Sequence, residues 1–428
     1  MVHNGSVLIR HVSASDVDAA AVRLDGVAAR TSLERNERLS RQTGAEVWFK
    51  REDLQPVRSY KIRGAYNLVA QLDGEARRCG VVTASAGNHG QGVAFACARL
   101  GVRGRVFVPT TTPRQKRDRM QVIGDGWIEL VVTGDTYDDS AAAAAEEASR
   151  TGAVMVPAFD DPRTVAGQGT VAAEIVAQLA DQDRAAPDVL AVPVGGGGML
   201  AGCLTWLAER APGTRVVGFE PAGAPTMTRA LEAGHPVELA VLDGFVDGAA
   251  VRRAGDLTYA VVAQHAPPLL TVPEGRVCAQ MLAMYQSDGI IAEPAGALAP
   301  AGLGLVDLEP GSTVVAIVSG GNNDVSRYAE ILERALVYEG RKHYFLVDFP
   351  QEPGALRRFL DSVLGPDDDI TLFEYVKRSN RETGPALVGV ELGDPATLPD
   401  LLARMAAVPM RVEAIDPGST AYRFLVAP

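Results

Sequence analysis

Cysteine is scarce in this sequence of 428 residues and forms no recognisable motif. The four cysteines are scattered, without a CxxC pair: Cys79, Cys97, Cys203 and Cys278. This spacing argues against a zinc site and a disulfide framework, and it is typical of free thiols in a reducing compartment. We therefore predict a cytoplasmic protein without a metal site.

Long apolar runs and an excess of positive charge are absent as well. No run of about 18 apolar residues occurs, which argues against a membrane span. The N-terminus carries Asp16, Asp18 and Asp25 and no apolar segment of the kind found in signal peptides. The formal net charge of -12 argues against a nucleic-acid-binding surface. We expect a soluble protein with neither a membrane nor a nucleic acid as partner.

Lysine is also rare, and one lysine has an unusual setting. The chain contains Lys50, Lys61, Lys116, Lys342 and Lys377. Lys61 lies between Tyr60 and Ile62, and small residues follow it. An amine among apolar and small residues is suited to imine formation with an aldehyde. The alternative interpretation is a surface lysine at the start of a helix.

From residue 46 onward, short apolar strands alternate with helices. The predicted strands are 46–50, 81–84, 105–109, 127–133, 154–157, 189–194, 215–220 and 314–319. The helices between them are predicted at 92–100, 112–124, 138–150, 164–178 and 199–208. Apolar strands without alternation are typical of parallel sheets that are buried on both faces. The order predicts an α/β fold.

The last part of the chain follows a different order. A helix at 331–341 precedes strand 343–349, helix 355–363, strands 370–377 and 386–392, helix 399–405 and strand 410–415. The order βαββαβ matches the ferredoxin-like split motif. We predict a domain boundary at about 330–342.

The strongest local signal is the run Gly195–Gly196–Gly197–Gly198–Met199. A buried strand leads into it and an apolar helix leads out. Backbone without side chains can wrap an anion, and the helix start offers free N–H groups. The run is not GxGxxG and lacks the Lys-Ser/Thr of a P-loop, so a phosphate group is the predicted guest, rather than a dinucleotide or a nucleoside triphosphate. The alternative, a flexible linker, does not fit between a buried strand and an apolar helix.

Two further loops follow predicted strands. One is SAGNHG (85–90), in which Asn88 can both donate and accept hydrogen bonds. The other is SGGNN (319–323), in which Ser319 can donate one hydrogen bond. Ligands in open α/β sheets bind outside such strand ends. The alternatives are a tight turn for the first loop and a helix N-cap for the second.

An imine-forming lysine, a phosphate cradle, an amide-bearing loop and a terminal hydroxyl together meet the needs of pyridoxal 5′-phosphate. In this interpretation Asn88 lies near the 3′ oxygen of the ring, and Ser319 bonds the ring nitrogen. A serine does not hold that nitrogen protonated as an aspartate would. The ring is then a milder electron sink, which favours elimination and replacement at Cβ over transamination.

Five motifs occur in an order that carries a resemblance: KREDLQPVRSYKIRGAYN, SAGNHGQGVA, PVGGGGMLAG, EPAGALA and SGGNN. The chain resembles the biosynthetic threonine dehydratases (threonine ammonia-lyases) of the fold-type-II pyridoxal-phosphate enzymes. The resemblance implies a catalytic domain over 1–330 with two parallel-sheet lobes, the smaller one, about 51–155, inserted in the larger. It further implies a linker helix at 331–342 and one ACT-like regulatory domain at 343–428.

The resemblance also implies roles for single residues. Lys61 would form the Schiff base and act as the catalytic base. The cofactor contacts would be Tyr60, Lys61, Asn88, Gly195, Gly196, Gly197, Gly198, Met199 and Ser319. The substrate carboxylate would lie at Ser85, Gly87, Asn88 and His89.

The implied reaction is the deamination of L-threonine to 2-oxobutanoate and ammonia, at the first committed step of isoleucine biosynthesis, and L-serine would be a second substrate. Isoleucine and valine would act as effectors at the C-terminal domain, and the chain would form a homotetramer. Two departures narrow this expectation. Ala86 replaces the serine that racemases of the superfamily need as a second base, and Thr226 stands where an aspartate would help Glu220 to hold a divalent cation.

Other functions stay open from the sequence. One is a catabolic serine/threonine deaminase or another enzyme of β-elimination or β-replacement, which should ignore isoleucine. Another, of a different class, is an amino-acid sensor with a degenerate catalytic half. The presence of Lys61, Asn88, the glycine run and Ser319 argues against the sensor.

Overall fold

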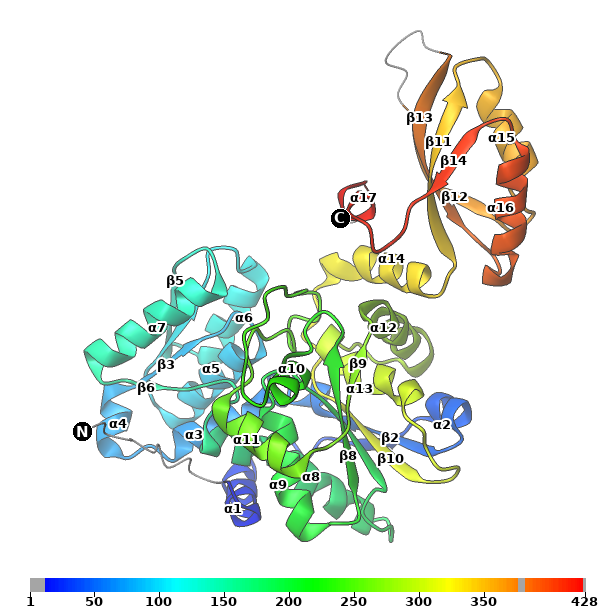
Figure 1. The fold of residues 1–428 in the computed structure, drawn as a ribbon. Helices are drawn as coiled ribbons and strands as arrows, with labels where there is room; N and C mark the ends of the chain where they lie inside the picture. Colours follow the sequence, from blue (N-terminus) through cyan, green and yellow to red (C-terminus); the bar gives the residue numbers. More distant parts are fainter. Residues whose placement is uncertain (1–11, 376–381, 426–428) are drawn as a thin grey trace. The chain divides into compact units, whose positions relative to one another are not determined.

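The computed structural model describes residues 12–375 and 382–425 (Figure 1). These residues form two compact units. The first unit holds the chain up to Glu274 together with Met284–Asn323. The second holds Gly275–Ala283 and the chain from Asp324 onward.

Two sheets form the frame of the first unit. The larger sheet has the order β1-β2-β10-β7-β8-β9, and all its neighbours are parallel except β1 and β2. Its strands are β1 (Leu33–Arg35), β2 (Glu46–Arg51), β7 (Val189–Pro193), β8 (Arg215–Pro221), β9 (Leu269–Val272) and β10 (Thr313–Val318). The smaller sheet, of order β5-β4-β3-β6, is parallel throughout. Its strands are β3 (Val81–Ala84), β4 (Gly104–Val108), β5 (Ile128–Val132) and β6 (Val154–Met155).

The composition of the strands explains why both faces of the larger sheet are covered. Strand β7 reads VLAVP and is buried at every position, and β10 is buried at every position except its first. Strands that are apolar at consecutive positions need helices on both faces. The predicted α/β class with two parallel sheets is confirmed, and each strand predicted for these two sheets is present with its ends shifted by at most two residues.

Helices surround these sheets (Figure 1). They are α1 (Ala14–Leu24), α2 (Glu37–Thr43), α3 (Lys61–Ala70), α4 (Gly74–Cys79), α5 (Asn88–Leu100), α6 (Arg114–Gly124), α7 (Tyr137–Thr151), α8 (Pro162–Ala180), α9 (Gly198–Arg210), α10 (Thr226–Ala233), α11 (Asp256–His265) and α13 (Pro294–Gly302). Helix α12 (Glu274–Asp288) contributes to both units. Within the described residues, no helix has the length and apolar character that crossing a membrane requires.

Helix α5 corrects one boundary of the sequence analysis. It was predicted to begin at Gly92, but it begins at Asn88, with Gly87 as its N-cap. The glycines that resembled turn residues allow close packing inside the helix instead. A Cβ on Gly90 would lie 2.5 Å from the Ser85 carbonyl oxygen, and one on Gly92 would lie 3.0 Å from the Lys61 carbonyl oxygen.

The second unit contains an antiparallel sheet of order β12-β13-β11-β14. In chain order its elements are β11 (Lys342–Pro350), α15 (Ala355–Val363), β12 (Asp369–Tyr375), β13 (Thr383–Glu391), α16 (Leu398–Ala407) and β14 (Arg411–Ala414). The predicted βαββαβ order is confirmed. The last residues of the predicted strand 370–377, Val376 and Lys377, lie outside the described residues.

Helices α15 and α16 cover one face of this sheet (Figure 1). Their side chains join a core that includes Phe345, Phe359, Val388 and Leu401. Helices α14 (Tyr328–Tyr338) and α17 (Thr420–Leu425) complete the unit. The second unit therefore has a hydrophobic core of its own.

Candidate active site

Lys61 is the first residue of α3, and the segment before it is fixed to the loop after β10. The Tyr60 amide donates to the Ser319 carbonyl oxygen at 3.1 Å, and the Gly321 amide donates to the Arg58 carbonyl oxygen at 2.9 Å. Residues that are more than 250 positions apart in the sequence thus lie side by side. The Lys61 Nζ atom lies 3.4 Å from the Ala158 carbonyl oxygen.

A buried ionic network holds the other side of α3. Arg63 donates to both carboxyl oxygens of Glu52, at 2.7 and 2.8 Å, and to Glu174 at 2.9 Å. Lys50, which is fully buried, donates to Glu174 at 2.5 Å. Burial alone would raise the pKa of Glu52, but Arg63 and Lys50 outweigh it and hold that pKa below its usual value. Because Arg63 is two residues from Lys61, the network fixes the turn that carries the amine.

The glycine run lies between β7 and α9 and has no room for side chains. A Cβ on Gly196 would lie 2.3 Å from the Phe159 ring, and one on Gly195 would lie 2.9 Å from the Ala249 carbonyl oxygen. Gly197 has φ of +89°, a left-handed conformation that favours glycine. The N–H groups of the first turn of α9 have no partner within the helix. The run therefore presents bare backbone and free donors, as an anion site requires. Met199, which follows, is buried.

Asn88 opens α5 and makes two side-chain hydrogen bonds. Its Nδ2 donates to Glu293 Oε1 at 2.5 Å, and its Oδ1 accepts from Asn322 Nδ2 at 2.7 Å. In the preceding loop the Gly87 amide donates to Ser85 Oγ at 3.3 Å. Asn88 therefore connects the loop after β3 with the loop after β10.

His89 is buried beside Asn88, and its ring is neutral at pH 7. Burial, reinforced by the neighbouring Lys61 ammonium, lowers its pKa to about 4. Its Nε2 bonds the Val156 carbonyl oxygen at 2.8 Å, which requires the Nε2–H tautomer. Its buried Nδ1 has no hydrogen-bond partner within residues 12–375 and 382–425. A neutral ring with an open acceptor is thus held close to the amine.

Ser319 directly follows β10 and is buried, and its Oγ donates to the Ala295 carbonyl oxygen at 3.1 Å. The fold therefore brings the loops of Lys61, Asn88 and Ser319 together through hydrogen bonds. The glycine run lies close to these loops as well. Gly195 packs against Ala249, and the residue before it, Gly248, lies near Asn88: a Cβ built on Gly248 would lie 4.0 Å from Asn88 Nδ2.

Four residues of this region were given no role from the sequence: Glu293, Asn322, Asp160 and Thr258. Glu293 lies in EPAGALA and Asn322 in SGGNN, so both stood in motifs that the sequence analysis quoted. Asp160 accepts from the amides of Asp256, Leu257 and Thr258 at the start of α11, and Thr258 Oγ1 donates to the Gly196 carbonyl oxygen at 2.6 Å. No pattern in the sequence signals this support of the glycine run, because the residues come from distant segments.

Glu220 serves a structural purpose. Its buried carboxyl accepts from the amides of Met227 and Thr228 and from Thr228 Oγ1, at 2.6 to 2.9 Å. Burial raises its pKa, and these donors oppose that shift. Within the described residues, no group of three or more His, Cys, Asp or Glu side chains is arranged to hold a metal ion.

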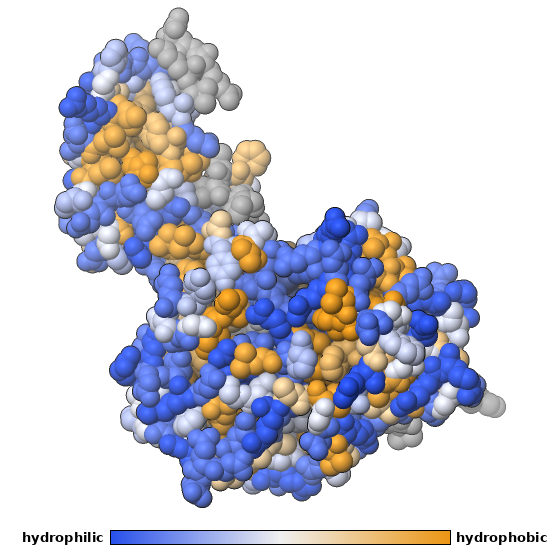
Figure 2. All heavy atoms as spheres, turned by 180° about the vertical axis from the view of Figure 1, so that it is seen from behind, coloured by the Kyte–Doolittle hydropathy of each residue, from blue (hydrophilic) through white to orange (hydrophobic). Residues whose placement is uncertain are grey.

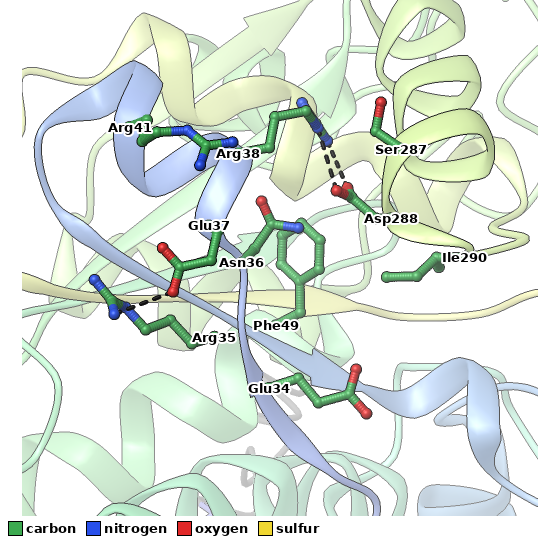
Figure 3. Close-up of a pocket in the computed structure, with 10 residues that line it drawn as sticks. All are labelled: Glu34, Arg35, Asn36, Glu37, Arg38, Arg41, Phe49, Ser287, Asp288 and Ile290. Carbon is green, nitrogen blue, oxygen red and sulfur yellow. Dashed lines mark hydrogen bonds and ion pairs between the residues drawn. The ribbon is translucent and has the colours of Figure 1, made fainter.

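A separate pocket of about 350 Å³ lies between β1, α2 and the end of α12 (Figure 3). Its lining carries charges of both signs, and Arg38 donates to Asp288 Oδ2 at 2.7 Å across it. None of the predicted site residues lines this pocket. It therefore plays no part in the arrangement around Lys61.

Two family models match the chain. Residues 24–320 match the family described as pyridoxal-phosphate dependent enzyme. Residues 333–425 match the family described as C-terminal regulatory domain of threonine dehydratase.

Known proteins are similar over nearly the whole chain. An L-threonine dehydratase biosynthetic IlvA of Mycobacterium tuberculosis is 62% identical over 417 residues, which are 97% of this chain and 96% of the relative. A protein of the same name from Bacillus subtilis is 45% identical, over 99% of this chain and 98% of the relative. The processed form of threonine deaminase isoform 2 from Solanum lycopersicum has a similar structure, with a TM-score of 0.70 and 37% identity, over 75% of this chain and 93% of that one.

Proposed function

The chain belongs to the pyridoxal-phosphate dependent enzymes, and from this premise we propose that it deaminates L-threonine to 2-oxobutanoate and ammonia. The observation that carries the proposal is the joining of the Lys61 segment, the Asn88 loop and the Ser319 loop by hydrogen bonds from residues far apart in the sequence. Biosynthetic threonine dehydratases that are 62% and 45% identical support the choice of substrate. The reaction makes the enzyme a lyase, at the first committed step of isoleucine biosynthesis.

The residues present fit pyridoxal 5′-phosphate. The glycine run is packed so closely against Phe159 and Ala249 that a Cβ at Gly195, Gly196 or Gly198 would clash, so the run offers bare backbone to a phosphate group. Lys61 offers a primary amine for the aldehyde. We assign the cofactor contacts to Tyr60, Lys61, Asn88, Gly195, Gly196, Gly197, Gly198, Met199 and Ser319.

Different residues of the site have different roles in the proposed reaction. When bound, pyridoxal 5′-phosphate supplies an electron sink that stabilises the negative charge left at Cα. Lys61 removes the Cα proton, and its place on the first turn of α3 keeps its Nζ within reach. We assign the substrate carboxylate to Ser85, Gly87, Asn88 and His89 at the N-terminal end of α5, where the helix dipole favours an anion. His89 would contribute its backbone N–H, because its ring N–H bonds Val156 and its Nδ1 is an acceptor. The neutral His89 ring adds no charge at this position.

We assign regulation to the second unit. Residues 343–428 form an ACT-like module in the proposal, with isoleucine and valine as effectors. The match of residues 333–425 to the regulatory domain family supports this assignment. We place the catalytic domain at 1–330, with a smaller lobe at about 51–155, and a linker at 331–342. The helix predicted for this linker is α14, which begins at Tyr328 and ends at Tyr338, and Lys342 already belongs to β11.

We further propose a homotetramer in the cytoplasm. Apolar side chains gather on part of the surface of the second unit, and we assign contacts between copies to this surface (Figure 2). Leu356 on α15 and Leu402 on α16 are among the exposed large apolar residues.

An assay for 2-oxobutanoate tests the proposal. Purified protein with pyridoxal 5′-phosphate should produce it from L-threonine, and isoleucine should inhibit production. L-Serine, assayed in parallel, would give pyruvate instead, so its turnover is followed by a pyruvate assay; one methyl group gives only about 1–3 kcal/mol of discrimination between the two substrates. Absence of product from either amino acid would refute the deaminase, and turnover that ignores isoleucine would indicate a catabolic enzyme.

A further inference from the structure

Glu293 is a buried carboxyl to which no role has been assigned. The residue is 5% exposed and stands at the N-cap of α13, where its side chain makes no capping hydrogen bond. Its Oε1 accepts from Asn88 Nδ2 at 2.5 Å instead. A buried carboxyl needs such partners, because burial without them is strongly unfavourable.

The neighbouring amides fix the direction of this hydrogen bond. Asn322 Nδ2 donates to the Val57 carbonyl oxygen at 2.9 Å and to Asn88 Oδ1 at 2.7 Å, which uses both of its hydrogens. The Val57 carbonyl can only accept, so the orientation of the Asn322 amide is set. The oxygen of Asn88 must then face Asn322, and its Nδ2 must face Glu293. Of the two hydrogens on Asn88 Nδ2, one goes to Glu293 and the second is left over.

The backbone holds Glu293 in this place. Its amide donates to the Gly320 carbonyl oxygen at 3.1 Å, and the Asn322 backbone also bonds its carboxyl. A Cβ on Gly320 would lie 2.1 Å from Glu293 Oε1 and 3.3 Å from Asn88 Nδ2. The Glu293 and Asn88 side chains therefore occupy the space that a side chain at position 320 would need, so this position requires glycine.

The acceptor role of Glu293 holds in either protonation state. Burial, and next the Asp247 carboxylate, raise the pKa of Glu293 to about 7, while Asn88, Lys116 and Asn322 oppose the shift. Both the carboxylate and the neutral acid carry an oxygen that accepts from Asn88. The hydrogen bond therefore does not depend on a full negative charge.

We propose that Glu293 is a positioning residue that acts through Asn88, holding the amide so that its remaining N–H is available to the ring oxygen of the cofactor. The proposal rests on the proposed function, since it assumes that Asn88 meets the cofactor. Glu293 itself need touch neither the substrate nor the reacting atoms.

Two substitutions test the acceptor. Glu293→Ala removes it, and the dissociation constant for pyridoxal 5′-phosphate, measured by absorbance titration, should rise roughly tenfold, as the loss of about one hydrogen bond implies. The visible absorbance maximum of the bound cofactor should shift as well. Glu293→Gln keeps an oxygen at the same place and should restore most of the affinity and the parent maximum.

Two further variants separate positioning from folding. Asn322→Ala removes the other anchor of Asn88 and should reproduce the weaker binding and the shifted maximum, which keeps the test intact if Glu293→Ala fails to fold. Glu220→Gln changes a different buried carboxyl, which only caps α10, and should lower the melting temperature without moving the maximum.

Parent-like cofactor affinity and absorbance in Glu293→Ala would overturn the proposal, as would equal losses in the Ala and Gln variants. Failure of the proposed function looks different. In that case the parent protein itself produces no 2-oxobutanoate.

Discussion

Lys61 is the residue on which the chemistry depends, and its position is fixed from both sides. The Tyr60 amide bonds the loop after β10, and Arg63 anchors α3 in the ionic network beneath. These contacts fix the backbone at Lys61, so the position of the amine depends only on the rotamers of the lysine side chain.

Lys61→Ala should abolish turnover, because no other amine would remain to bond the aldehyde and remove the Cα proton. The measurement is 2-oxobutanoate formation at saturating cofactor. Lys342→Ala is the matched control, since Lys342 pairs with Glu333 in the second unit. An active Lys61→Ala variant would refute the assignment.

The buried His89 ring leads us to predict how the stability of the protein depends on pH. Its folded pKa of about 4 lies below the usual value of 6.5, so the unfolded chain takes up the proton first as the pH falls. The contribution of His89 to stability is present above pH 6.5 and is lost toward pH 4, by an amount on the order of 3 kcal/mol. In His89→Gln this loss should be absent, and urea unfolding of both proteins at pH 4.5 and 7 measures it.

The parent protein must be compared with His89→Gln because Glu293 changes the free energy of unfolding with pH in the opposite direction. Its folded pKa of about 7 lies above its usual value, so its contribution is present below pH 4.5 and is lost as the pH rises toward 7. The two effects offset each other in the parent protein. Stability profiles of parent and His89→Gln that run parallel from pH 4.5 to 7 would contradict the assignment to His89.

At the scale of elements, the glycine run depends on close contacts that leave no space for side chains. Gly197→Val places a branched side chain at φ of +89°, where an ideal Cβ already lies 2.5 Å from Met227. We expect a purified protein without bound cofactor, measured as pyridoxal 5′-phosphate content after alkaline release. Gly213→Val is the control, because a Cβ there meets no atom within 4 Å. Normal cofactor content in Gly197→Val would argue against the cradle.

The buried network under α3 predicts a large effect on stability. Arg63→Ala leaves Glu52 buried without its main partner and should lower the free energy of unfolding by about 3–5 kcal/mol. Arg229→Ala removes a pair whose side chains are more than half exposed and should change it by less than about 1 kcal/mol. Urea unfolding of the cofactor-free proteins compares the two, and similar losses would show that the network is not a main support of α3.

Most strands could be predicted, in their order along the chain, because their apolar runs are short, continuous and separated by helical segments. The short strand β1 was not predicted. The stretch between β8 and β10 could not be resolved in the same way. It holds β9 and helices α10 to α13, with glycine and proline inside or beside them, as in Pro294–Gly302. Such residues normally signal turns, but Gly296 and Gly302 pack against Gly320 and Phe219. Local sequence cannot distinguish a turn from a tertiary contact of this kind.

The candidate site was predictable to the extent that its residues lie in local motifs: Asn88 and Ser319 in loops that follow β3 and β10, and Lys61 among apolar and small residues. Lys61, Asn88 and Ser319 each carry such a signal. Glu293 and Asn322 had no role, because their function appears only when α13 and the loop after β10 meet α5. The roles of the predicted site residues stay predictions until the variants are measured.

At the scale of the whole molecule, a catalytic unit and a unit that matches a regulatory domain occur on one chain. Removal of residues 343–428 should leave turnover and abolish inhibition by isoleucine, since the remaining sheets of the first unit keep their own core. Initial rates at increasing isoleucine concentration measure the effect, with circular dichroism as the control for folding. Unchanged inhibition in the truncated protein would remove the regulatory assignment.

The central claim is that Lys61 holds the cofactor, and reduction of the loaded enzyme with borohydride followed by peptide mass spectrometry tests it most directly. We predict that the visible absorbance disappears and that the pyridoxyl mass is found on the peptide that contains Lys61. A label on another lysine, or a protein that stays colourless when supplied with pyridoxal 5′-phosphate, would contradict the account.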